Sequence, residues 1–213
     1  MNKFSVVIPT LWRSFRIHKL LDDLIKCNDI DDIIIIDNNK GYYNYYDKIL
    51  DKVNLIQLDD NIYVNPAWNL GVSLSKNVNV ALLNDDINFN TEIFNFLNSS
   101  KLEVYGIIGS DPSNYEINIF NPKINNENYR TKQRFGWGCF IAFNKKYWVD
   151  IPNNIKLWYG DDFIRFFNKA PISYLTGFSI KTDMSTTSGD PIWRVRKMLD
   201  AQNFNALLPK KSY

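Results

Sequence analysis

Short apolar runs alternate with stretches of helical periodicity along the first half of the chain. The runs predict four strands, at residues 4–8, 32–37, 54–58 and 78–83. Apolar positions at helical spacing predict helices at residues 14–25, 45–50 and 66–75. The segment DIIIID at 32–37 is apolar on both faces, which is typical of a parallel strand covered by helices on both sides.

After Thr91 the pattern becomes mixed. Helical spacing predicts helices at residues 91–99, 161–168 and 191–204, the last of them amphipathic. Apolar runs predict strands at residues 104–108, 139–144, 172–175 and 178–181. A loop is expected through Pro122 and Asn128.

The alternation of strands and helices predicts βαβ units and a mainly parallel sheet, because parallel neighbours need a crossover connection. We therefore expect an α/β fold with a Rossmann-like central sheet and helices on both faces. No stretch rich in Gly, Ser or Pro separates the two halves of the chain, so residues 1–213 are expected to form a single domain.

Polar residues gather where the four strands of the first half end. In open α/β sheets, ligands bind beyond the carboxyl ends of the strands, so these positions are candidates for a ligand site. The residues concerned are Pro9-Thr10, Asp37-Asn38, Asp59-Asp60-Asn61 and Asn84-Asp85-Asp86.

The triplet Asn84-Asp85-Asp86 offers two adjacent carboxylates after an apolar strand. Mg²⁺ and Mn²⁺ prefer oxygen ligands and usually take one or two protein carboxylates together with phosphate oxygens. A metal and diphosphate site is one interpretation. The other is a solvated turn in which Asp85 or Asp86 caps the next helix, since Asn and Asp favour such positions without any chemistry.

The charge balance excludes some partners. The 25 basic and 23 acidic residues leave a formal net charge of +2, which does not indicate a nucleic-acid partner. Cys27 and Cys139 lack the spacing of a zinc site or a disulfide framework, which favours a reducing compartment, and we expect the cytoplasm. No apolar run reaches the roughly 18 residues of a membrane span, so no transmembrane segment is expected.

Aromatic residues make up 15% of the chain, and several stand among polar neighbours. Ordinary core packing and a stacking surface for bases or sugars are both compatible with this pattern. The second interpretation leaves open a non-catalytic glycan-binding module. Examples of such residues are Trp12, Trp68, Trp137 and Trp158.

Four segments, SVVIPTLWR, DIIIIDNN, DNIYVNPAWNLG and LLNDDINF, resemble in order and approximate spacing the motifs of the GT-A glycosyltransferases. The resemblance is greatest to the large inverting family that includes bacterial rhamnosyltransferases. No single motif is specific for this family, whereas the four motifs together, in this order and spacing, are. Tyr63 and Asp60 depart from the pattern, since the family has glycine and usually glutamate there. The matching positions are Pro9, Thr10, Arg13, Asp37, Asn38, Asn61, Ala67, Asn69, Gly71, Asn84 and Asp86.

The resemblance implies a role for each of these residues. Asp37 would accept a hydrogen bond from the nucleobase imide, and Thr10 and Arg13 would line the base and phosphate region. Asp86 would bind the Mn²⁺ or Mg²⁺ ion that bridges the diphosphate, with Asp85 as second ligand or ribose contact. The other nucleotide-sugar contacts that the resemblance implies are Pro9, Asn38, Asn61, Asn69 and Asn84.

The second half resembles the same family more loosely. FGWGCFIAFNK is similar to the glycine-containing strand under the donor sugar, so Trp137 and Gly138 are expected donor contacts. WYGDDFI is similar to the element that supplies the general base, which implies Asp162 as the base and Asp161 as the alternative. Either carboxylate could also cap a helix N-terminus.

Many relatives place a histidine late in the chain as a further metal ligand. The single histidine of this chain, His18, falls in the first predicted helix, where a surface or packing role is expected. The corresponding region here is SIKTDMSTTSG, which makes Asp183 the substitute candidate. Lys181, Arg194 or Arg196 could instead neutralise the diphosphate.

The function implied is metal-dependent, inverting transfer of rhamnose or another hexose from a UDP-sugar to a glycan hydroxyl. Residues 1–90 would form the nucleotide-binding half, and residues 91–213 the donor-sugar and acceptor half, which includes a smaller acceptor-side subregion. A nucleotidyltransferase is the alternative enzyme, although TLWRSF lacks the glycine such enzymes carry. The chain also resembles in overall texture the N-terminal domain of a large chlorovirus glycan-synthesis protein, which implies further domains, a donor like UDP-L-rhamnose and the host cytoplasm.

Overall fold

The computed structural model describes residues 2–39, 51–100, 102–110, 112, 119–125, 137–183 and 191–209. Its strands are β1 (Phe4–Thr10), β2 (Ile30–Asp37), β3 (Val53–Gln57), β4 (Asn79–Leu83), β5 (Ile87–Phe89), β6 (Ile107–Ser110), β7 (Phe120–Asn125), β8 (Phe140–Asn144), β9 (Ile172–Phe178) and β10 (Ile180–Thr182). Eight of them form one sheet in the order β3-β2-β1-β4-β8-β6-β9-β7, and β5 pairs with β10.

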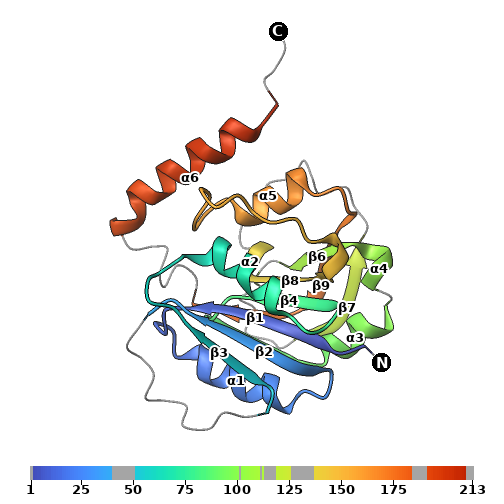
Figure 1. Cartoon of the computed structure of the whole chain (residues 1–213). Helices are drawn as coiled ribbons and strands as arrows, with labels where there is room; N and C mark the ends of the chain where they lie inside the picture. Colours follow the sequence, from blue (N-terminus) through green and yellow to red (C-terminus); the bar gives the residue numbers. More distant parts are fainter. Residues whose placement is uncertain are drawn as a thin grey trace.

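Six α-helices are described: α1 (Arg16–Lys26), α2 (Val64–Leu74), α3 (Ile93–Ser99), α4 (Leu102–Tyr105), α5 (Gly160–Phe167) and α6 (Arg194–Leu207). In Figure 1, α1 lies on one side of the sheet and α2 and α5 on the other. The α/β fold with helices on both faces is therefore confirmed. None of the helices described is long and apolar enough to cross a bilayer.

The isoleucine side chains of β2 contribute to the hydrophobic cores on both faces of the sheet. Successive strand residues point to opposite faces. Ile33 and Ile35 therefore join the core that includes α1 and α3, whereas Ile34 and Ile36 join the core that includes α2 and α5. All four side chains are buried, which accounts for the unbroken apolar run.

The strand directions bring the predicted polar ends to one edge of the sheet. β2 runs parallel to β1 and to β3, and β4 also runs parallel to β1. The register places Thr10 beside Asp37, and Asp37 beside Gln57. The mixed character of the second half comes from β8 and β7, which are antiparallel to their neighbours.

Most elements predicted in the first half are confirmed, with boundaries shifted by one or two residues. The predicted strand at 104–108 is wrong at its start, because Gly106 at φ 73° separates α4 from β6 and divides the apolar run. The predicted loop through Pro122 is instead β7, and β5 was not expected. The predicted helix at 45–50 and the loop position Asn128 lie outside the described residues.

The β7 strand is difficult to recognise because it is an edge strand. It pairs only with β9 among the described strands, and its register shifts between Phe120 and Lys123, around Pro122. Proline lacks an N–H for the ladder and is confined to edges and bulges. A polar, proline-containing sequence is therefore compatible with a strand here.

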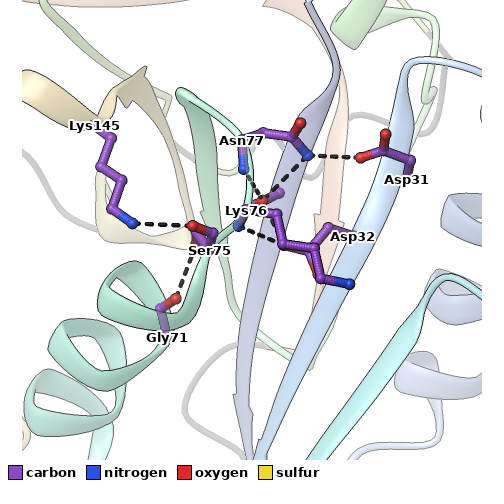
Figure 2. A network of polar contacts seen from close by, with 8 residues as sticks. Asp31, Asp32, Gly71, Ser75, Lys76, Asn77 and Lys145 are labelled. Atoms are coloured by element: carbon purple, nitrogen blue, oxygen red, sulfur yellow. Dashed lines mark hydrogen bonds and ion pairs between the residues drawn. The ribbon is translucent and has the colours of Figure 1, made fainter.

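A buried polar network closes the opposite, amino-terminal edge of the sheet (Figure 2). The Asp32 carboxylate, 1% exposed, accepts hydrogen bonds from the Ser5 hydroxyl (2.6 Å) and the Lys76 backbone N–H (3.0 Å). Lys145 Nζ donates to the Ser75 carbonyl (3.0 Å), just after α2. These hydrogen bonds fasten the turn between α2 and β4 to the starts of β1 and β2.

Helix α2 approaches β1 most closely at Gly71. A Cβ atom added there would lie 2.1 Å from Val7 Cγ1 and 2.9 Å from Val7 Cγ2. The absence of a side chain at Gly71 thus sets the distance between the helix and the central strands.

Gly71→Ala should lower the free energy of unfolding by about 1–3 kcal/mol through overpacking. In a Val7→Ala background the clashing methyl groups are gone, and the same substitution should be neutral or stabilising, since Ala is favoured over Gly in a helix by about 1 kcal/mol. Urea unfolding of the four proteins measures the coupling. An equal cost in both backgrounds would contradict this packing.

Candidate functional site

Thr10 joins three of the four predicted strand ends. Its hydroxyl donates a hydrogen bond to Asp85 Oδ2 (2.6 Å), after β4, and accepts one from the Trp12 N–H (2.7 Å). Its carbonyl accepts from the Asn38 N–H (2.9 Å), after β2. One threonine at the end of β1 thus connects the acidic triplet to the Asp37-Asn38 turn.

The Asp37 carboxylate at the end of β2 is 1% exposed. Its Oδ1 accepts a hydrogen bond from the Asn39 N–H (2.9 Å). Its Oδ2 is buried and has no hydrogen-bond partner among the described residues. Buried polar atoms are nearly always paired, so this oxygen is suited to accept a donor from a ligand.

The two asparagines predicted nearby shape the loop that follows β3. Asn38 Oδ1 accepts from the Ile62 N–H (3.0 Å), and Asn61 Oδ1 accepts from the Tyr63 N–H (2.7 Å). Tyr63 itself has φ 71°, in the region that favours glycine. The residue that departs from the family's glycine therefore keeps a glycine-like backbone, held by these side chains.

Asp85 and Asp86 lie side by side in a desolvated environment. Burial raises the pKa of Asp85 to about 6, and the hydrogen bond from Thr10 offsets this only in part. Burial also raises the pKa of Asp86, which is 8% exposed. Asp86 Oδ1 is buried without a hydrogen-bond partner among the described residues. Two desolvated carboxylates of this kind favour a cationic ligand.

Asp183 reaches the acidic triplet through the pairing of β10 with β5. Its N–H donates to the Asp86 carbonyl (3.3 Å). Its carboxylate accepts from Arg16 Nε (2.6 Å) and from the Ser14 hydroxyl (3.2 Å). Asp183 is therefore near the predicted metal site, but its oxygens are engaged by α1 and the residues before it.

The side chains at this site suit a divalent ion that takes part of its coordination shell from phosphate and water oxygens. Within the described ranges, no group of three or more His, Cys, Asp or Glu side chains is arranged to hold a metal ion by itself. Asp85 and Asp86 nevertheless supply two adjacent carboxylates, one with an unpartnered buried oxygen. Mg²⁺ commonly takes only one or two protein carboxylates and completes its shell with phosphate and water.

The segment Trp137–Cys139 lies directly beside the triplet, because the Asn84 N–H donates to the Cys139 carbonyl (3.1 Å). The Trp137 ring is 1% exposed and packs against Gly109, where a Cβ would lie 2.0 Å from the ring. At Gly138 a Cβ would lie 3.2 Å from the Asp161 Cβ. The strand end predicted to lie under the donor sugar thus faces the predicted catalytic carboxylates.

The two carboxylates of the first turn of α5 differ in surroundings. Asp162 pairs with Arg165 at 3.5 Å, and the Arg165 side chain is 1% exposed. Asp161 faces Gly138, and burial together with the Asp162 charge raises the pKa of Asp161 to about 6. Burial also raises the pKa of Asp162, but Arg165 opposes the shift. Asp161 is therefore closer to a proton acceptor poised near neutral pH.

Other predicted site residues are placed differently. Asn69 uses both polar atoms of its amide on the Ile151 backbone, at 2.8 and 3.0 Å, so it braces α2 against that loop. Pro9 is buried in β1, and Arg13 is exposed just after it. The suggested aromatic stacking surface is not found at Trp12, Trp68 or Trp137, which are at most 8% exposed.

Sequence reasoning missed the residues that hold Asp183. Arg16 donates to both Asp183 and Asn88, with Nη1 at 3.2 Å from Asn88 Oδ1. Ser14 contributes a further hydrogen bond. In the sequence these residues are only the polar start of the first helix. Polar residues are common at helix N-termini and do not by themselves indicate a functional contact.

No protein-family model and no curated protein sequence matches the chain. Among solved structures, S. aureus TarS 1–349 matches with a TM-score of 0.58 at 16% identity, covering 98% of this chain and 67% of that one. Its complex with UDP-GlcNAc gives 0.62 at 16% identity, with 98% and 68% covered. Its complex with UDP gives 0.62 at 15% identity, with 98% and 67% covered.

TarS is a glycosyltransferase, and at this level of identity the likeness establishes the fold. The chain therefore has the GT-A fold that its sequence predicts. A longer TarS chain is covered over 41% of its length, so this chain corresponds to one part of it.

Asp161→Asn should stabilise the protein at neutral pH. The pKa of Asp161 is raised from 3.8 to about 6 on folding, so its contribution to stability is present below 3.8 and is lost as the pH rises through about 6. The variant should gain about 1–3 kcal/mol at pH 8 and little at pH 4, measured by urea unfolding. Asp162→Asn should gain less at pH 8, because Arg165 opposes the rise in the pKa of Asp162; equal gains in the two variants would contradict the assignment.

Proposed function

We propose that the chain is an inverting glycosyltransferase that takes its sugar from a UDP-linked donor with the help of Mn²⁺ or Mg²⁺. The observation that carries the proposal is a pair of buried carboxylate oxygens without partners among the described residues, Asp37 Oδ2 and Asp86 Oδ1. They lie at strand ends that Thr10 connects. The likeness to TarS bound to UDP and to UDP-GlcNAc supports this class of ligand.

The nucleoside is held at the β1–β2 end of the site. Asp37 Oδ2 accepts the imide N–H of uracil, which supplies the missing hydrogen bond of that buried oxygen. Pro9, Thr10 and Arg13 line the same strand end, and Asn38 and Asn61 fix the loop beside it. Asn84 and Asp85, which follow β4, contact the ribose and the diphosphate in this proposal.

Asp86 is the first metal ligand and Asp85 the second. Asp183 is the third candidate, and it must release Arg16 to serve. A bound Mn²⁺ or Mg²⁺ neutralises the charge that develops on the departing diphosphate. Without the ion, the two desolvated carboxylates would repel the phosphates, so the site requires a cation.

Asp161 is the general base that we favour, with Asp162 as the alternative. The acceptor hydroxyl oxygen attacks the anomeric carbon, its proton passes to the Asp161 carboxylate, and the bond from that carbon to the UDP oxygen breaks. A Cβ at Gly138 would lie 3.2 Å from the Asp161 Cβ, so the absence of a side chain lets this segment lie close to the base. Because attack and departure occur on opposite sides, the anomeric configuration inverts.

The identity of the sugar rests on the sequence resemblance, which favours rhamnose or another hexose transferred to a glycan hydroxyl. One domain with halves at 1–90 and 91–213 rests on the lack of a linker, and a cytoplasmic site of action on the spacing of the two cysteines. Further domains in a longer viral polypeptide rest on the separate resemblance to the chlorovirus protein. The nucleotidyltransferase is disfavoured because the loop after β1 has no glycine, and the glycan-binding module because Trp12, Trp68 and Trp137 are buried.

UDP should bind with measurable heat when Mn²⁺ is present. Asp86→Asn should weaken that binding about tenfold or more, a loss of about 1.4 kcal/mol, and the difference from the wild type should vanish in EDTA. Asp37→Asn should weaken binding in both conditions, because its contact is with the base. Isothermal titration measures the UDP affinity of the wild type and of the two variants. No binding of UDP by the wild-type protein would contradict the proposal.

Asp161→Asn should reduce kcat by about 10²–10⁴-fold with little change in the KM for the donor, because it removes only the base. Asp162→Asn should have a smaller effect. Wild-type turnover should fall as the pH drops through about 6, where Asp161 becomes protonated. A screen of UDP-sugars for Mn²⁺-dependent hydrolysis first identifies the donor. A larger loss of kcat in Asp162→Asn than in Asp161→Asn would make Asp162 the general base.

A further inference from the structure

The loop that leads into the catalytic turn is held by a residue of the C-terminal helix. Asp200 of α6 is 0% exposed. Its carboxylate accepts three backbone hydrogen bonds, from the N–H groups of Lys156 (3.0 Å), Leu157 (2.8 Å) and Trp158 (3.1 Å). Three successive amides therefore converge on one buried carboxylate.

Helix α2 holds the other side of the same loop. Asn65 Nδ2 donates to the carbonyls of Ile155 and Trp158, both at 3.2 Å, and the Asn65 N–H donates to the Lys156 carbonyl (3.0 Å). A Cβ at Gly160 would lie 2.1 Å from Asn65 Oδ1. The amides of the loop are thus bound by α6 and its carbonyls by α2.

The loop that α6 and α2 hold leads directly to the carboxylates of α5. Tyr159 adopts φ 64°, a left-handed conformation, and its ring stacks on Phe204 of α6 at 5.2 Å. Gly160 and Asp161 follow in the first turn of α5. Any movement of residues 156–158 is therefore transmitted over three residues to Asp161.

We propose that Asp200 is a positioning residue for catalysis: by fixing the amides of residues 156–158, α6 sets Asp161 against Gly138. This inference rests on the proposed function. The groups assigned to the nucleotide lie on the strand ends of the sheet, whereas Asp200 contacts only this loop and Arg196 in the interactions described. Asp200 therefore governs turnover, and the nucleotide binds without it.

A purely structural carboxylate exists for comparison. Asp32 is equally buried and also accepts a backbone N–H, from Lys76, but it lies at the opposite edge of the sheet (Figure 2). Asp32→Asn is therefore a matched control for the general cost of neutralising a buried, hydrogen-bonded aspartate.

The test compares Asp200→Asn with Asp32→Asn in the whole chain. Asp200→Asn should lower kcat by about 10–100-fold, the effect of a small misplacement of a catalytic group, while UDP affinity in Mn²⁺ stays within about twofold. Asp32→Asn should leave kcat near the wild-type value at temperatures where both variants are folded. Asp200→Glu, which keeps the carboxylate, should recover part of the rate. Equal kcat values in the two Asn variants, or a parallel loss of UDP affinity in Asp200→Asn, would overturn the proposal.

A second measurement does not depend on the reaction. Amide hydrogen exchange at residues 156–162 should accelerate in Asp200→Asn and not in Asp32→Asn. Unchanged exchange at these residues overturns the positioning role. Failure of the wild-type protein to bind UDP or turn over a donor would instead defeat the proposed function, so the two failures are distinguishable.

Discussion

The hydrogen bond from the Thr10 hydroxyl to Asp85 Oδ2 is the contact on which the arrangement of the site depends. It joins the end of β1 to the end of β4, while the Thr10 carbonyl holds the Asn38 N–H at the end of β2. Parallel pairing brings the three strand ends to one edge, and these contacts tie the acidic triplet to the Asp37 turn. The geometry of a nucleoside diphosphate site follows from them.

The site is built from carboxylates that the fold leaves unsatisfied. At the amino edge of the sheet, Asp32 Oδ2 accepts from Ser5 and Lys76, and Asp32 Oδ1 has the Lys76 ammonium at 3.7 Å in place of a hydrogen bond. At the carboxyl edge, Asp37 and Asp86 each keep a buried oxygen without a partner among the described residues. Leaving such atoms unpaired costs stability, a cost that a bound base or cation would offset. An unpartnered oxygen alone does not mark a ligand site; Asp37 and Asp86 are suited to bind ligand because they also lie at the carboxyl ends of the strands.

The sequence predicted the sheet, the strand ends and the carboxylates because these follow from local periodicity and from motifs in register. It did not predict β7, whose proline and polar residues are permitted only by its edge position. The resemblance ranked Asp162 above Asp161, and we favour the reverse order, since the difference arises from Arg165 and Gly138, which meet them only in the folded chain. The role of Asp200 could not be predicted for the same reason. In the sequence it is an acidic residue four positions before Phe204, and only the fold shows that both lie on the buried side of α6.

The central claim is that the carboxyl edge of the sheet binds a uridine diphosphate across the Thr10 contact. A crystal structure of the chain with UDP and Mn²⁺ tests it most directly. We expect the uracil imide against Asp37 Oδ2 and the metal ion on Asp86, with the diphosphate between them. Density for the nucleotide away from Asp37, or a metal ion bound without Asp86, would contradict it.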